Sequence, residues 1–94
     1  MALSSHQRQR LKAQAHSLNP VVLMGEKGLT QSVLVETDLA LMAHELIKVK
    51  MPAAEKKVRQ ATIEEICQKI NCDLVQLIGN ILILYRKKTK KKGS

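Results

Sequence analysis

A strand-like run that ends in a glycine loop constrains the fold of this 94-residue chain more than any other feature. Four apolar residues, Val21 to Met24, lead into Gly25-Glu26-Lys27-Gly28, and Thr30 follows where a helix N-cap is expected. This order predicts a buried strand, a turn and then a helix. Backbone N–H groups without intrahelical partners give such a helix N-terminus a partial positive charge, which suits an anion. A turn that merely needs two flexible residues is the alternative interpretation.

Helical and extended patterns alternate along the chain. Ser4 or Ser5 is expected to cap a first helix that ends near Leu18, before Asn19-Pro20. Further helices are predicted at about 30–43 and 54–70, and strands at 21–24, 46–51, 74–78 and 81–85, the last two joined by a Gly79-Asn80 turn. The predicted fold is α/β, in the order α-β-α-β-α-β-β, with three helices and a small mixed four-stranded sheet. Helical crossovers make the first three strands parallel in sense, and the hairpin reverses the last strand.

The apolar spacing also predicts which faces are buried. The unbroken run Val21 to Met24 is typical of a strand that is covered on both faces. The helix at 30–43 is unusually apolar, so we expect it to pack tightly on the sheet. Its buried face is predicted to consist of Val33, Thr37, Ala40 and Leu41, with Leu34 and Met42 widening it. In the strand at 46–51, alternation directs Lys48 and Lys50 to the outward face.

The charge balance indicates the class of partner. Sixteen Lys and Arg residues stand against eight Asp and Glu residues, a formal net charge of +8. This excess predicts a polyanion, most often nucleic acid and less often an anionic membrane surface. Tyr85 is the single aromatic residue, which argues against a broad base-stacking surface, and it is expected to pack at the end of the sheet. Binding is therefore expected to depend on backbone contacts and charge.

Other classes of function lack support in the sequence. No arrangement of a nucleophile with a base, phosphate-binding loop or metal-ligand spacing is present, so neither an enzyme nor a cofactor or metal is expected. Cys67 and Cys72 are expected to be reduced, with Cys67 packed in the core. No apolar run is long enough to span a bilayer, and the first residues do not resemble a secretory signal, so a cytoplasmic protein is expected.

Candidate phosphate contacts fall into three groups. The glycine loop supplies backbone donors and one cation, the first helix and the strand at 46–51 carry further cations, and a basic run begins at the end of the last strand. For the helix and strand cations an ordinary solvated face is the alternative. The residues at 87–94 are expected to form a disordered basic tail that follows a domain at 1–86. The candidates are Gly25, Lys27, Gly28 and Thr30; Arg8, Arg10 and Lys12; Lys48 and Lys50; and Arg86, Lys87 and Lys88.

Four blocks of residues in a fixed order resemble a known family. They are Ser5-His6-Gln7 through Pro20-Val21, Gly25-x-x-Gly28-Leu29-Thr30, Glu45 to Lys50, and Val75-Gln76-x-Ile78-Gly79-Asn80 through Leu84-Tyr85-Arg86. Over about residues 3 to 88 they resemble the YhbY-type CRM domain, named for chloroplast RNA splicing and ribosome maturation. Two departures stand out: Glu26 is an acid where basic or small polar residues are common, and Asn71 stands where Gly is common. Asn71 is expected to close the helix at 54–70 in the left-handed conformation, which asparagine tolerates.

The resemblance implies an RNA-binding domain with a fold similar to the C-terminal domain of bacterial translation initiation factor three. It implies that Gly25 and Gly28 belong to a loop comparable with that of KH domains, which clamp a nucleic-acid backbone. It also implies ribosomal RNA and precursors of the large ribosomal subunit as partners of a monomeric protein, with no small-molecule substrate. An alternative is a translation-factor-like protein that docks on the ribosome mainly through protein contacts.

Overall fold

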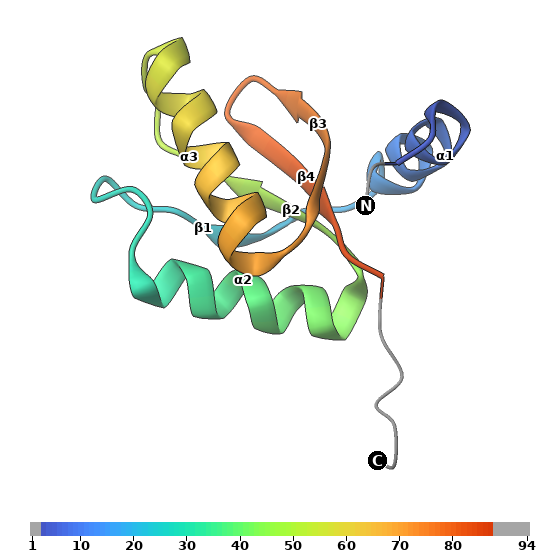
Figure 1. Ribbon diagram of the computed structural model, residues 1–94, viewed down its shortest axis with the longest axis horizontal. Coiled ribbons are helices and arrows are strands. Elements are labelled where there is room, and N and C mark those ends of the chain that lie inside the picture. The colour runs from blue at the N-terminus through green and yellow to red at the C-terminus, as the bar shows by residue number, and fades with distance from the viewer. Residues whose placement is uncertain (1–2, 88–94) are drawn as a thin grey trace.

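The computed structural model describes residues 3–87, and its elements follow one another in the predicted order (Figure 1). Predictions for residues 88–94, which include Lys88 and most of the basic tail, lie outside this part of the chain. No helix within residues 3–87 is both long and apolar enough to cross a membrane. The elements are α1 (Ser5–Ala15), β1 (Pro20–Leu23), α2 (Gln31–His44), β2 (Leu46–Lys50), α3 (Lys56–Ile70), β3 (Asp73–Ile78) and β4 (Ile81–Tyr85).

The strands form one mixed sheet in the order β1-β2-β4-β3. β1 and β2 are parallel, whereas β4 runs antiparallel to both β2 and β3. The first three strands therefore share one direction and the last is reversed, as predicted. The hairpin turn has Gly79 at φ +58°, a backbone conformation that glycine adopts without steric cost.

Two apolar clusters hold the helices against opposite faces of the sheet (Figure 1). The larger cluster packs α2 and α3 on one face through residues such as Leu41, Ile66 and Leu84. The smaller cluster packs α1 on the other face around Ala15 and Ile83. Because Leu82 and Leu84 enter one cluster and Ile83 the other, β4 is covered on both faces.

Two predictions about burial are wrong. β1 is an edge strand, and Val21 and Leu23 are 52% and 66% exposed. The strand residues of the smaller cluster come from β2, β3 and β4, so α1 does not cover the face of β1 that carries these two side chains. Met42 does not widen the buried face of α2, since it is 53% exposed on the side of the helix away from the sheet. Val33, Thr37 and Leu41 are buried, as predicted.

The ends of the helices are set by local sequence. Ser4 caps α1 in a capping box: its hydroxyl oxygen accepts from the Gln7 N–H, and Gln7 Oε1 accepts from the Ser4 N–H, both at 3.1 Å. Asn71 closes α3 in the left-handed conformation, as predicted. Glu45 is the single residue between α2 and β2, and this abrupt junction holds it at φ +65°.

Candidate nucleic-acid interface

The glycine loop is a tight turn that projects between β1 and α2. The Gly28 N–H donates to the Gly25 carbonyl oxygen at 2.9 Å, which closes the turn, and Glu26 and Lys27 are exposed at its tip. Gly28 has φ +76°, so the turn itself favours glycine there. Gly25 has no positive φ, and a Cβ built on it would meet nothing within 4 Å. The fold therefore does not explain a glycine at position 25.

The loop leads directly to the N-terminus of α2. Thr30 is the N-cap, and its Oγ1 accepts from the Val33 N–H at 3.2 Å. The intrahelical bonds begin with the Leu34 N–H, which donates to the Thr30 carbonyl at 3.0 Å. The amides of Gln31 and Ser32 precede this bond, so they have no partner within the helix and face the end where the helix dipole is positive. The Thr30 hydroxyl therefore caps the helix, while the amides of Gln31 and Ser32 are left as donors for an anion.

Beside the loop lies a groove, which the sequence did not predict. Its volume is about 400 Å³, and it separates Lys27, Gly28 and Leu29 from the segment Met51–Ala54 and from α3. The α3 side chains that line it are Val58, Thr62 and Glu65. Val58 is 52% exposed. Its position among the charged residues at the start of α3 is the one sequence signal that could have indicated this surface. The groove therefore runs from the loop to α3.

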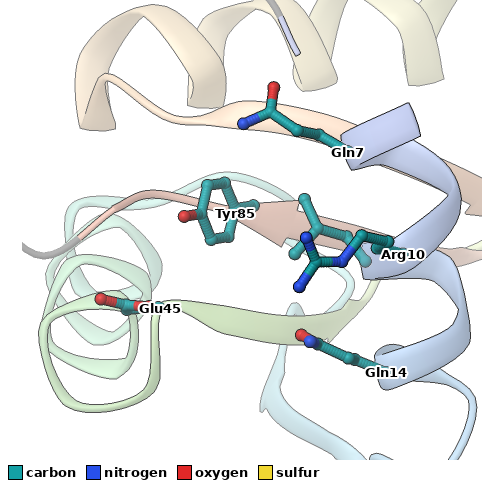
Figure 2. A pocket seen from close by; sticks show the side chains of 6 residues that line it. Gln7, Arg10, Gln14, Glu45 and Tyr85 are labelled. Atoms are coloured by element: carbon teal, nitrogen blue, oxygen red, sulfur yellow. The ribbon is translucent and has the colours of Figure 1, made fainter. Parts of the chain in front are cut away.

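The predicted cations of α1 have different environments. Arg8 is half-buried, and its guanidinium donates to the carbonyl oxygens of Leu74 and Val75 in β3, so it ties α1 to the sheet. Lys12 is also half-buried. Arg10 is exposed and points into a hollow between α1 and the ends of β2 and β4 (Figure 2). Of the three, Arg10 presents its charge most openly.

The two lysines of β2 also differ. Lys48 is half-buried, and its Nζ donates to the carbonyl oxygen of Leu18 at 2.9 Å. This bond ties the connection after α1 to the sheet. Lys50 is exposed at the end of the strand. Only Lys50 keeps the outward, solvated position that the alternation predicts for both.

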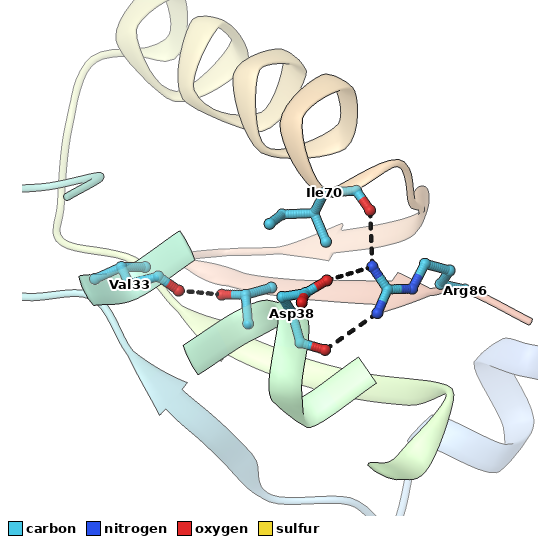
Figure 3. A network of polar contacts seen from close by, with 5 residues as sticks. Val33, Asp38, Ile70 and Arg86 are labelled. Atoms are coloured by element: carbon cyan, nitrogen blue, oxygen red, sulfur yellow. Dashed lines mark hydrogen bonds and ion pairs between the residues drawn. The ribbon is translucent and has the colours of Figure 1, made fainter. Parts of the chain in front are cut away.

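Arg86 holds three segments together. Its Nη1 donates to Asp38 Oδ1 at 2.7 Å and to the Ile70 carbonyl at 2.8 Å, and its Nη2 donates to the Asp38 carbonyl at 3.1 Å (Figure 3). The guanidinium therefore joins the end of β4 to α2 and to the C-terminus of α3. The structure gives it a structural role, whereas Lys87, the next residue, is exposed.

Three comparisons with known proteins bear on this arrangement. Residues 3–86 match the model of the CRS1 / YhbY (CRM) domain family. The chain belongs to this family. A Haemophilus influenzae protein named as an RNA-binding protein is 48% identical over 90 residues, 96% of this chain and 91% of the relative. A Pseudomonas aeruginosa protein named as a probable RNA-binding protein is 46% identical over 90 residues, 96% of this chain and 86% of the relative.

The fold of this CRM domain also occurs in a solved structure. A Staphylococcus aureus protein described as a candidate RNA-binding protein superposes with a TM-score of 0.82 at 26% identity, covering 97% of this chain and 95% of the other. The predicted family and fold are thus confirmed. The individual phosphate contacts stay predictions. Among them, Lys27, Arg10, Lys50 and Lys87 are exposed, whereas Arg8, Lys48 and Arg86 bond to the protein itself.

The two cysteines of this CRM domain form a thiol pair at the end of α3. A hydrogen bond from the Cys72 thiol lowers the pKa of Cys67, and burial of Cys67 opposes this only in part. The same bond and burial raise the pKa of Cys72. Cys67 packs against the larger apolar cluster, in agreement with the sequence, and no group of three potential metal ligands lies together in residues 3–87.

The pair makes a prediction about reactivity. Because the thiolate is the nucleophile, iodoacetamide at pH 7 should modify Cys67 before Cys72, and mass spectrometry of peptides at successive times measures the order. Cys72→Ala removes the donor, so the pKa of Cys67 should rise and its alkylation at pH 7 should slow. Equal rates for Cys67 in the two proteins would contradict the hydrogen bond.

Proposed function

We propose that this CRM domain binds RNA in the cytoplasm, as a monomer, through the Gly25–Gly28 loop and the N-terminus of α2. Exposed cations at Lys27, Arg10, Lys50 and Lys87 add attraction for phosphate. The RNA is ribosomal, and the protein assists assembly of the large ribosomal subunit. The family, the printed names of the relatives and the net charge of +8 support RNA as the partner.

The observation that carries the proposal is the exposed glycine at position 25. A Cβ there would meet nothing within 4 Å, so folding alone does not call for glycine. A phosphate that approaches the turn does call for it, because a missing Cβ lets the nucleic-acid backbone come close to the protein backbone. The amides of Gln31 and Ser32 then serve as donors to that phosphate.

The loop should act more through its backbone than through side-chain charge. Glu26 and Lys27 are both exposed at the tip, and their formal charges cancel. The positive end of α2 and the cations elsewhere on the surface therefore supply the net attraction.

Three variants test the loop. Gly25→Ala, Gly28→Asp and Lys27→Glu should each weaken binding to precursor large-subunit particles about three- to tenfold, measured by co-sedimentation. Gly25→Ala is the sharpest, since it should leave the thermal unfolding midpoint unchanged. Gly28→Asp places a side chain at φ +76° and should cost about 1 kcal/mol of stability, within what the fold tolerates. Unchanged affinity in all three folded variants would exclude the loop from the interface.

The alternative function, docking on the ribosome mainly through protein contacts, predicts a different response to salt. Each phosphate contact should reduce affinity about threefold between 50 and 200 mM salt, because bound counterions are released. In a salt titration, Kd should therefore rise steeply if RNA is the ligand. A flat response would favour protein docking. Crosslinking in cells, followed by sequencing of the attached RNA, then tests whether the site lies in large-subunit RNA.

A further inference from the structure

A second concave surface lies away from the glycine loop. Figure 1 shows α1 and the loop after β1 at opposite ends of the molecule. At the α1 end, a hollow of about 230 Å³ opens between α1, the junction before β2 and the end of β4 (Figure 2). Its lining is Gln7, Arg10, Leu11, Gln14, Glu45 and Tyr85.

The lining from α1 follows one helical face. Gln7, Arg10, Leu11 and Gln14 are at i, i+3, i+4 and i+7, the spacing that usually places apolar residues against a sheet. Here three of the four are long and polar, although they face the hollow that Tyr85 also lines. Leu11, Ala15 and Leu18 belong to the smaller apolar cluster, and these contacts already hold α1 on the sheet. The polar residues of this face are therefore available for another task.

The groups in the hollow suit a planar ring with polar edges. Tyr85 packs one part of its ring against the smaller apolar cluster and leaves another part exposed, which makes it a stacking surface. Gln7 is held in place because its Oε1 accepts from the Ser4 N–H, and its Nε2 keeps its donors. Gln14 offers a second amide, and the Arg10 guanidinium is planar and stacks on rings.

A phosphate fits the hollow less well than a base. The side-chain amides of Gln7 and Gln14 are neutral and offer both donors and acceptors, which matches the edge of a base, whereas a phosphate only accepts. We propose that the hollow holds one unpaired base of a bound RNA, stacked on Tyr85 and Arg10 and bonded at its edges by Gln7 and Gln14. This inference rests on the proposed RNA-binding function.

The composition of the chain makes the test direct. Tyr85 is the only Tyr, and the chain has no Trp and no Phe, so its fluorescence and its ring NMR signals report on this hollow alone. The full chain is titrated with single-stranded rA8, rC8 and rU8 and with a blunt RNA duplex of eight base pairs. Fluorescence anisotropy of end-labelled RNA measures binding independently. We expect saturable quenching and shifted Tyr85 ring signals with at least one single strand, and neither with the duplex.

A matched pair of variants separates stacking from charge. Arg10→Lys keeps the charge and removes the planar group, and Arg10 is exposed, so the fold should be unaffected. The affinity for the single strand that quenches best should fall about threefold to tenfold in Arg10→Lys. Lys57→Arg, an exposed change at the start of α3, should leave it within twofold.

The possible failures are distinguishable. If anisotropy shows binding while Tyr85 is unperturbed by every RNA, the hollow is not a base site and the proposed RNA binding stands. Equal quenching by the duplex would also overturn the inference, because a paired base cannot enter the hollow. If no RNA changes the anisotropy, the proposed function fails and this inference fails with it.

Discussion

Replacing Arg86 with alanine should lower the free energy of unfolding by about 2–3 kcal/mol, because hydrogen bonds from a charged donor to Asp38 and Ile70 are lost together. The loss leaves the Ile70 carbonyl at the end of α3 without this donor. Asp38 is partly exposed, so the ion pair itself contributes the smaller share. Urea unfolding followed by circular dichroism measures the change.

Two controls separate the structural role of Arg86 from a contact with RNA. Asp38→Asn keeps both backbone acceptors and removes the charge, so it should cost less than Arg86→Ala. Arg86→Lys keeps the charge but lacks the fork that reaches three acceptors, so its cost should be close to that of alanine. RNA affinity of Arg86→Lys, measured where it is fully folded, should equal that of the wild type. A large loss of affinity without loss of stability would restore Arg86 to the interface.

Replacing Leu41 with alanine should cost about 3 kcal/mol, the other large effect that we expect. Leu41 is fully buried in the larger cluster, where truncation removes apolar burial and leaves a cavity. The net stability of a domain of this size is about 5–10 kcal/mol, so this variant loses a large fraction of it. The thermal midpoint should fall by well over 10 °C.

Leu39 provides the matched control on the same helix. It lies two residues before Leu41 and is 58% exposed, so Leu39→Ala should change stability by less than about 0.5 kcal/mol. Similar costs for the two variants would show that the packing of α2 on the sheet differs from the arrangement in Figure 1. The comparison also tests which apolar side chains of α2 are buried against the sheet and which face solvent.

The candidate site was only partly predictable from sequence. The loop glycines and the Thr30 N-cap were identified because turn and cap preferences act over three or four residues. The expected contacts at Arg8, Lys48 and Arg86 were assigned from charge alone. In the structure their partners come from segments 66, 30 and 16 or more residues away, which no local pattern reveals. The hollow at Tyr85 combines residues from three such segments and was missed for the same reason.

By itself the sequence determined the family, the order of elements, the turn at Gly79-Asn80 and the helix ends at Ser4, Thr30 and Asn71. These depend on backbone preferences and side-chain bonds within one turn of chain. Tertiary structure alone decided that β4 lies between β2 and β3 and that β1 is an edge strand. It also decided which cations bond to carbonyl groups of the protein and which face solvent. The physical reason is that exposure and hydrogen-bond partners are properties of packed surfaces, and packing joins residues that are distant in sequence.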